Sequence, residues 1–193
     1  MTASKLLWWR DDDAIEDGPE LRRIIELSAR WDVPLALAVI PALAKSSLVE
    51  IGQEPKIDFL VHGFAHENHA PSGERKAEFT SGMDLGGLRR MLSDGHTRLK
   101  RLVPKALPVF VPPWNRFPSE HLRELEAAAY SGFSAWGSET GWRYDGGIRI
   151  ANTHLDLIDW KGGASPKPIG QLLSEFHNLC WATDRACLLY TSD

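Results

Sequence analysis

Two histidines and a run of aspartates carry the clearest chemical signal in this sequence. His62 and His66 stand four residues apart, directly after the apolar run 57–61, and a second apolar run, 6–9, precedes three aspartates at 11–13. Two neutral imidazoles and one carboxylate can hold a divalent ion and leave coordination positions for water and substrate, as a catalytic zinc requires. The pattern therefore predicts a catalytic metal site.

Short apolar runs alternate with helical patterns along the chain. The run 33–40 is almost continuously apolar, as in a strand buried on both faces, and leucines recur at helical spacing over 84–103. Strands are predicted at 5–10, 33–40, 57–62, 109–111, 133–136, 148–157 and 186–190, and helices at 19–31, 42–53, 84–103, 119–130 and 168–179. This alternation over one domain, residues 1–193, predicts an α/β fold with a parallel sheet or barrel.

The candidate residues stand where such a fold gathers its active groups, at the carboxyl ends of strands. The aspartates 11–13 are predicted to follow the first strand, and His62 and His66 the third. The Pro- and Trp-containing segment 112–116 follows the next strand, and residues 156–160 follow a later one. We therefore expect all of them at one end of the sheet.

The composition argues against several classes of function. The chain has 193 residues, a net charge of −4 and 43% hydrophobic residues, which is ordinary for one globular domain. It lacks the long basic run that phosphate binding needs, so nucleic acid is not an expected partner. No run approaches the roughly 18 apolar residues of a membrane span, and no signal segment begins the printed chain. We expect a cytoplasmic protein with no membrane partner.

The order of these motifs resembles the polysaccharide deacetylase family, carbohydrate esterase family 4, with its NodB-homology domain. The shared features are an Asp pair after the first strand, His-x-x-x-His, a Pro-rich aromatic segment and Asp-Trp, over residues 10–160. The resemblance implies a distorted (β/α) barrel of about seven strands. It also implies an enzyme that removes N-acetyl groups from hexosamine polymers, with one Asp as general base and an Asp-His-His triad that holds zinc or another divalent transition metal.

Carried onto this sequence, the resemblance makes His62 and His66 metal ligands. Family members with an Arg two positions before the Asp pair, matched to Arg10, make Asp12 the base and Asp13 the third ligand. The alternative register makes Asp11 the base and Asp12 the ligand. We prefer the first register.

The resemblance also indicates residues that contact the substrate. Flat aromatic rings with nearby amides and charges suit sugar rings. The substrate-binding candidates are Pro113, Trp114, Asn115, Arg116 and Trp160. Asp159 is expected either to orient a catalytic group or to cap a helix. The other tryptophans considered, Trp8, Trp9, Trp31 and Trp136, are expected in the core.

The chain departs from the family pattern in two places. Val111 stands where members commonly have an Arg that supports the base, and either Arg10 or Arg116 could take over that role. The Leu-x-x-His that supplies the general acid is missing from residues 188–193. We expect that the C-terminus is truncated or altered, or that His69 or His154 acts instead.

These observations favour a metal-dependent hydrolase that deacetylates an amino-sugar polymer or a related amide. The missing acid leaves a second hypothesis open, a non-catalytic carbohydrate-binding or scaffolding protein with a degenerate deacetylase fold. A third hypothesis is a different metallohydrolase, such as an esterase or phosphodiesterase.

Overall fold

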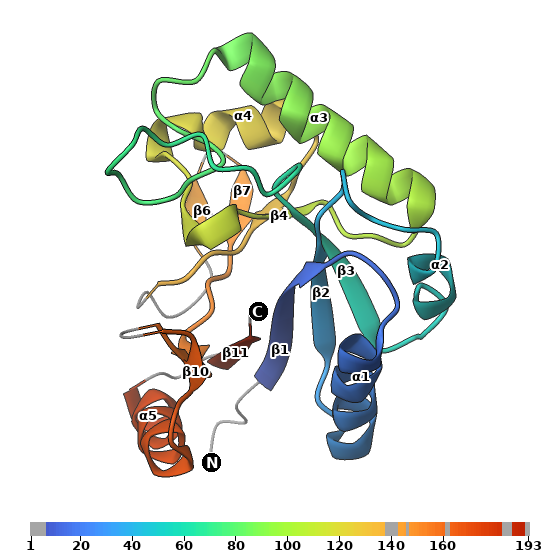
Figure 1. Cartoon of the computed structure of the whole chain (residues 1–193), viewed down its shortest axis with the longest axis vertical. Helices are drawn as coiled ribbons and strands as arrows, with labels where there is room; N and C mark the ends of the chain where they lie inside the picture. Colours follow the sequence, from blue (N-terminus) through green and yellow to red (C-terminus); the bar gives the residue numbers. More distant parts are fainter. Residues whose placement is uncertain (1–6, 138–142, 146, 161–162, 183–186, 192–193) are drawn as a thin grey trace.

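The computed structural model describes residues 7–137, 143–145, 147–160, 163–182 and 187–191. Within these residues, nine strands form one sheet in the order β6-β7-β5-β4-β3-β2-β1-β11-β8 (Figure 1). Its strands are β1 (Leu7–Ala14), β2 (Leu35–Val39), β3 (Ile57–His62), β4 (Val109–Val111), β5 (Gly132–Phe133), β6 (Arg143–Asp145), β7 (Ile148–Ile150), β8 (Leu155–Asp156) and β11 (Cys187–Thr191). Their pairing is parallel except between β6 and β7, and β9 (Ile158–Asp159) pairs separately with β10 (Ser165–Pro166). The predicted α/β class with a parallel sheet is confirmed.

The sheet must curve strongly, because β7 and β8 are second and ninth in its order but nearly adjacent in the chain. Seven strand spacings would separate them by about 34 Å in a flat sheet. The chain from Ile150 to Leu155 reaches at most about 18 Å. The sheet therefore curls into the barrel-like shape that the sequence predicts.

Helices cover the outer face of this sheet (Figure 1). They are α1 (Pro19–Trp31), α2 (Leu48–Ile51), α3 (Leu85–Leu102), α4 (Leu122–Ala127) and α5 (Ile169–Ala182), with the short 3-10 turns η1 (Pro113–Asn115) and η2 (Ser119–His121). The prediction of a helix over 42–53 is wrong for its first half, because α2 begins only at Leu48. There Ala42 N–H donates to Phe64 and Lys45 N–H to Ile15, so neighbouring loops take the hydrogen bonds that a helix would need. Among the described residues, no helix combines the length and apolar character needed to cross a bilayer.

The two faces of the sheet bury different side chains. On the helix side, Phe59 and Phe110 join a large core with the leucines of α3. The inner face holds a small separate cluster of Ala36, Ala38, Leu60 and Val111. Arg10 is aligned with Ala36, and His62 with Val111, so both face inward with this cluster. The small alanines of β2 leave room there for polar side chains.

The aspartates 11–13 do not follow the first strand, as predicted, but lie inside it. Asp11 is aligned with Leu37 of β2 on one side and with Thr191 of β11 on the other. Aspartate is depleted in strands, but backbone pairing on both sides overrides this weak preference.

Two of the four tryptophans expected in the core are exposed. Trp31 is 68% exposed at the end of α1, where the guanidinium of Arg30 lies over its ring, and Trp136 is 45% exposed. Trp9 packs against the large core and Trp8 against the inner cluster, so the prediction holds for these two.

Candidate metal centre

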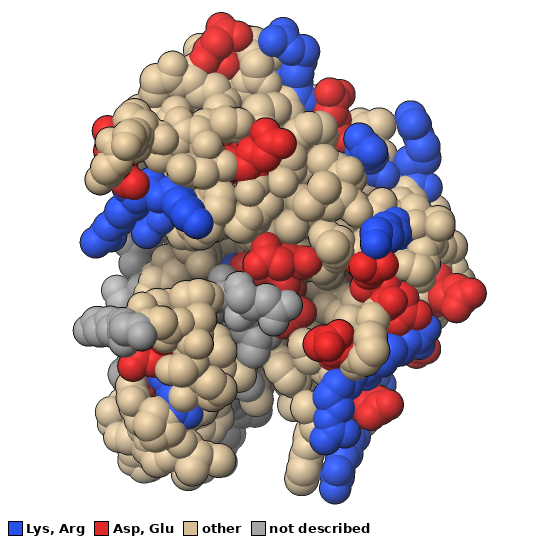
Figure 2. All heavy atoms as spheres, in the orientation of Figure 1, with Lys and Arg blue, Asp and Glu red and all other residues tan. Residues whose placement is uncertain are grey.

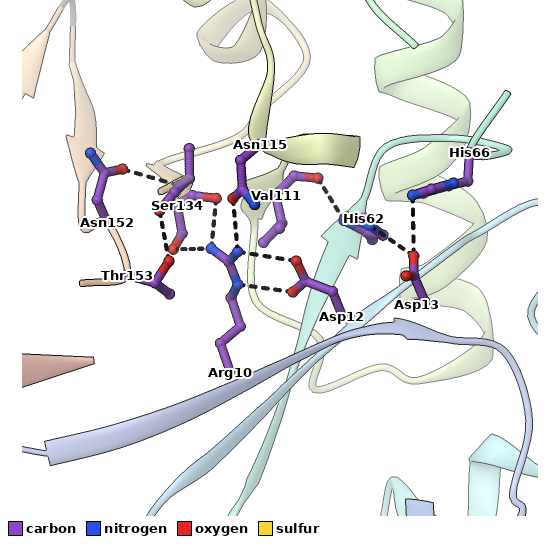
Figure 3. A network of polar contacts seen from close by, with 11 residues as sticks. Arg10, Asp12, Asp13, His62, His66, Val111, Asn115, Ser134, Asn152 and Thr153 are labelled. Carbon is purple, nitrogen blue, oxygen red and sulfur yellow. Dashed lines mark hydrogen bonds and ion pairs between the residues drawn. The ribbon is translucent and has the colours of Figure 1, made fainter. Parts of the chain in front are cut away.

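A break in the pairing of β1 changes where its last two aspartates point. In a regular strand, consecutive side chains project to opposite faces, so the sheet would separate Asp12 from Asp13. Here the register with β2 shifts between Asp11 and Ala14, and Asp13 has a φ of 67°. Such a bulge re-aims a side chain. Figure 3 shows Asp12 and Asp13 on the same side of β1.

Asp13 meets both histidines of the His-x-x-x-His motif. Its Oδ1 lies 3.1 Å from Nε2 of His62 and 3.2 Å from Nε2 of His66 (Figure 3). Each of the three residues offers one ligand atom, and these atoms all lie within 4.8 Å of one another. His62, at the end of β3, is buried, whereas His66 in the following loop is partly exposed. The structure thus brings together the three residues that the sequence suggested as metal ligands.

A hydrogen bond at Nδ1 of His62 determines the protonation of its other ring nitrogen, Nε2, which faces Asp13. Nδ1 lies 3.1 Å from the carbonyl oxygen of Val111, and a carbonyl can only accept, so Nδ1 carries the hydrogen and donates it. Nε2 of the neutral ring is then unprotonated. Metal-binding histidines typically make this kind of second hydrogen bond.

When Nε2 of His62 and Nε2 of His66 carry no proton, Asp13 Oδ1 is a buried atom that accepts no hydrogen bond from the described residues. It shares a small volume with the Nε2 lone pair of His62, and such electron pairs repel unless a cation lies between them. Two imidazole nitrogens and a carboxylate oxygen suit zinc or another divalent transition metal. The residues present therefore fit a divalent metal ion.

The surroundings shift the titration of all three residues. Burial raises the pKa of Asp13, but the imidazoles of His62 and His66 outweigh burial and lower it. Burial lowers the pKa of His62, but the carboxylates of Asp12 and Asp13 outweigh burial and raise it. For His66, burial and the nearby His62 lower the pKa more than Asp13 and Glu78 raise it. A proton on His62 competes with a metal for Nε2, so metal affinity falls with decreasing pH.

Backbone strain is concentrated around this cluster. Six non-glycine residues of the described chain have positive φ, and four of them belong here: Asp13 (67°), His66 (59°), Trp114 (53°) and Asn115 (55°). The left-handed region is uncommon for such residues and costs about 1–3 kcal/mol each. Strain of this kind tends to gather at functional sites.

Asp12 is held by a fully buried arginine from its own strand. Nε of Arg10 donates to Asp12 Oδ1 at 2.9 Å and Nη2 donates to Oδ2 at 3.0 Å. The guanidinium also donates to the Ser134 carbonyl and hydroxyl and to Asn115 Oδ1 (Figure 3). Of the two arginines suggested to support the base, Arg10 is therefore the one that contacts Asp12, the base in the preferred register. Val111, which stands where members of the family commonly have an Arg, packs in the inner cluster.

Arg10→Met is expected to lower the free energy of unfolding by about 3–5 kcal/mol, because it leaves the buried carboxylate of Asp12 unpaired. Urea denaturation measures this loss. In the double variant Arg10→Met/Asp12→Leu, which buries no charge at this pair, part of the stability should return. Arg22→Met, which breaks the exposed pair with Asp17, is the control and should cost much less. Equal losses for Arg10→Met and Arg22→Met would contradict the prediction.

A buried carboxylate that sequence reasoning missed holds the loop between His62 and His66. Glu78 is fully buried, and its oxygens accept hydrogen bonds from Phe64 N–H (3.0 Å) and Ala65 N–H (2.7 Å). Gly63 has a φ of 58°, and a Cβ there would lie 2.0 Å from Glu78 Oε2. Glycine is therefore needed beside this carboxylate. Glu78 lies in a polar segment with no local pattern to mark it.

Glu78→Gln should weaken zinc binding by about tenfold, because the amide group cannot accept both backbone N–H bonds that shape the His66 loop. Competition with a chelator measures the affinity, and thermal unfolding of the metal-free protein reports any general destabilisation. Glu74→Gln changes an exposed residue nearby and should have no effect. An unchanged zinc affinity in Glu78→Gln would show that Glu78 does not position the loop.

The three candidate ligands open into a cleft of about 1010 Å³. It is lined by Asp13, His62, His66, Arg75, Trp114, Asn115, Arg116, Trp136, Asp156, Ile158, Asp159, Trp160, Lys167, Gln171 and Glu175. Of the predicted substrate residues, only Pro113 is absent from this lining, because it is buried against the loop that contains Gly63. Asp159, the other predicted residue of this region, also lines the cleft.

Three tryptophans give the cleft aromatic surfaces. The Trp114 ring lies 4.2 Å from the His66 ring, centre to centre. Trp136 and Trp160 are 45% and 49% exposed, and Trp160 Nε1 donates to Asp156 Oδ2 at 2.8 Å. Trp136 was expected in the core, since nothing in its sequence surroundings distinguishes a cleft residue from a buried one.

The remaining candidates lie outside the cleft lining. Asp11 and the buried Asp12 are not part of it. Neither are the two histidines suggested as general acids, and His69 is bound through Nδ1 to the carbonyl of Glu78 at 2.7 Å. His154 has a buried Nδ1 on the segment between β7 and β8. The structure does not bring His69 or His154 to the cleft.

No protein-family profile and no curated protein sequence matches this chain. Solved structures do resemble it. A candidate polysaccharide deacetylase from Mycobacterium smegmatis is 14% identical, with a TM-score of 0.74 over 100% of this chain and 78% of the other. The Bc1960 peptidoglycan N-acetylglucosamine deacetylase is 14% identical, with a TM-score of 0.65 over 99% and 73%.

A third similar structure is BA3943 from Bacillus anthracis, described as a pseudoenzyme of carbohydrate esterase family 4. It is 14% identical, with a TM-score of 0.63 over 100% of this chain and 56% of the other. At these identities the likeness establishes the fold. The chain has the barrel-like fold of carbohydrate esterase family 4 deacetylases, as the motif order predicted.

Proposed function

We propose that this protein is a metal-dependent hydrolase that removes N-acetyl groups from an amino-sugar polymer. One observation carries the proposal: Asp13, His62 and His66 converge, with a buried and unsatisfied carboxylate oxygen, at a cleft large enough for sugar rings. The Bc1960 structure, which has the same fold, is a peptidoglycan N-acetylglucosamine deacetylase. This likeness supports the choice of substrate.

In this proposal Asp13, His62 and His66 hold the ion, which is zinc or another divalent transition metal. When bound, such an ion supplies Lewis-acid chemistry, since it activates water and polarises a carbonyl. Asp13 contributes one negative charge, and the Val111 carbonyl orients His62. Three protein ligands leave coordination positions free, which distinguishes a catalytic from a structural site.

Asp12 is the proposed general base. It precedes Asp13, and its charge raises the pKa of His62, which places it close to the candidate ligands. Arg10 holds both of its oxygens, but a carboxylate oxygen has two lone pairs, so each can still accept a proton or hydrogen bond. Because Asp12 is buried, the proton that it accepts as general base would come from the metal centre and not from bulk water.

The cleft residues suit a carbohydrate. Trp114, Trp136 and Trp160 offer aromatic faces for sugar rings, while Asn115 and Gln171 offer amide groups for hydroxyls. The acetamido group of the substrate would lie at the metal centre with the sugar beside Trp114, whose ring contacts His66.

The departing amine needs a proton as the C–N bond breaks, and the described cleft lining has no histidine besides His62 and His66. The chain is therefore expected to hydrolyse acetate esters at least about tenfold faster than matched acetamides, because an ester leaving group depends less on a positioned acid. Acetate release from matched substrates measures the ratio. Amide hydrolysis as fast as ester hydrolysis, unaffected by His69→Ala and His154→Ala, would show that another group supplies the proton.

The proposal is tested by loading the protein with zinc and measuring acetate release from N-acetylglucosamine oligomers. Release above that of a zinc-loaded Asp12→Asn protein is expected. The second candidate, a non-catalytic carbohydrate-binding protein, is favoured by the lack of a further cleft histidine and by the fold likeness to the BA3943 pseudoenzyme. It predicts oligosaccharide binding without release of acetate.

A further inference from the structure

Three cationic side chains gather around Trp114 at the cleft, and we call them the basic rim: Arg75, Lys76 and Arg116. Arg75 and Arg116 line the cleft, and the Lys76 ammonium lies 5.9 Å from the centre of the Trp114 ring. Nη1 of Arg116 donates to the Lys76 carbonyl at 2.7 Å, which joins two distant segments. Figure 2 shows Lys and Arg side chains grouped on the left of this face, beside the loop of residues 67–82 in Figure 1.

The three cations of the basic rim form no ion pair with the described residues. In the part of the chain that the structure describes, no carboxylate lies within 4.0 Å of its three cations. Burial and the closeness of Arg75 lower the pKa of Arg116, as expected for adjacent like charges. This occurs in a chain whose net charge is −4. An anion bound at the rim would relieve the repulsion.

Apart from Asp13 of the candidate metal centre, the acidic residues of the cleft come from a different segment, residues 156–175, where they make other contacts. Glu175 pairs with Lys167 at 3.0 Å and accepts from Gln171 at 2.7 Å. Asp156 accepts hydrogen bonds from Trp160 Nε1 and from Ile158 N–H. The charge of the cleft is therefore uneven, and an anionic substituent is favoured at the rim.

We propose that the basic rim binds an anionic group, a carboxylate or a phosphate, on the substrate whose acetamido group lies at Asp13, His62 and His66. This inference rests on the proposed function and narrows its substrate to acidic amino-sugar polymers. Guanidinium groups match the paired oxygens of carboxylates and phosphates. The Trp114 ring contacts His66 and also lies beneath Lys76, so the two ends of one substrate segment would meet the metal centre and the rim.

The test is calorimetric binding of three matched oligosaccharides to the zinc-loaded protein. One is a neutral N-acetylglucosamine oligomer, one alternates N-acetylglucosamine with a uronic acid, and one carries a phosphate. At low salt, at least one acidic ligand should bind about tenfold tighter than the neutral one, and high salt should reduce this ratio. Preference for the uronic acid or for the phosphate identifies which anion the rim takes.

Variants locate the effect. Arg75→Gln removes an exposed cation, and Arg116→Gln removes its neighbour, so each should reduce the acidic-to-neutral affinity ratio several-fold. Arg90→Gln makes the same charge change at an exposed position of α3 that does not line the cleft, and it should leave the affinity ratio unchanged. A ratio near one in the wild type, a ratio that neither cleft variant reduces, or no binding of any ligand would overturn the inference.

Acetate release in the same samples separates this inference from the proposed function. Preferential binding of an acidic ligand without acetate release would support anion binding at the basic rim and contradict deacetylase activity. Acetate release with equal affinities for neutral and acidic ligands would support deacetylase activity and contradict anion binding at the basic rim.

Discussion

Replacement of His62 by alanine is expected to abolish stoichiometric binding of zinc. His62 is the buried member of the cluster, and Val111 holds its Nδ1 so that Nε2 faces Asp13 Oδ1 at 3.1 Å. Removing it leaves two protein ligands, and three is the usual minimum for a catalytic zinc. Elemental analysis after dialysis measures the metal content, which should fall from about one zinc per chain to a trace.

His96→Ala is the matched control for this variant. His96 is a partly buried histidine that stacks on Tyr130 and does not line the cleft. It should keep the full metal content. His66→Ala, at a more exposed ligand, should also lose zinc, and this separates ligand loss from misfolding of the buried His62 variant. A folded His62→Ala protein that retained one tightly bound zinc would refute the ligand set.

Asp12→Asn should retain zinc and lose at least about 10²-fold in kcat, the range of general acid–base contributions. The amide cannot take a proton from the attacking water, yet it keeps the shape of the carboxylate beside Arg10 and can accept one of its two hydrogen bonds. Asp13→Asn should instead lose zinc, because Asp13 supplies the oxygen between the two imidazoles. Metal content and acetate release measured on both proteins distinguish the two roles.

Asp11→Asn is the control in this series, since Asp11 is aligned with Leu37 of the large core and so projects to the opposite face of the sheet from Arg10. It should keep both zinc and activity. If Asp12→Asn lost the metal while Asp11→Asn lost only rate, the base and the ligand would be one residue earlier, at Asp11 and Asp12. The contact of Asp13 with both histidines is the observation that favours the later register.

The strands and the main helices were predictable because their apolar periodicity is strong. The run 33–40 yields β2, and the leucines of 84–103 yield α3 with Asp84 as its N-cap. The candidate ligands were also predictable, since the carboxyl ends of parallel strands meet at one edge. The short β6 and the β9–β10 pair were missed, because two- or three-residue strands depend on their partners and leave little pattern.

The details of the site depend on contacts that sequence periodicity does not carry. The bulge at Asp13 arises from a register shift against β2, and regular alternation would have separated Asp12 from Asp13. Arg10 was suggested as a support for the base, but its full burial follows from the small alanines of β2 on the inner face. Glu78 reaches the His66 loop from twelve residues further along, in a segment without periodicity.

The most direct test of the central claim is acetate release from an acidic N-acetylated oligosaccharide and from its neutral counterpart, before and after chelation. We expect release by the zinc-loaded protein, loss of release after the metal is removed, and recovery when zinc is added back to the wild type but not to His62→Ala. Release that persists in the chelated protein, or no release from any N-acetylated sugar by protein that carries one zinc per chain, would contradict a metal-dependent deacetylase.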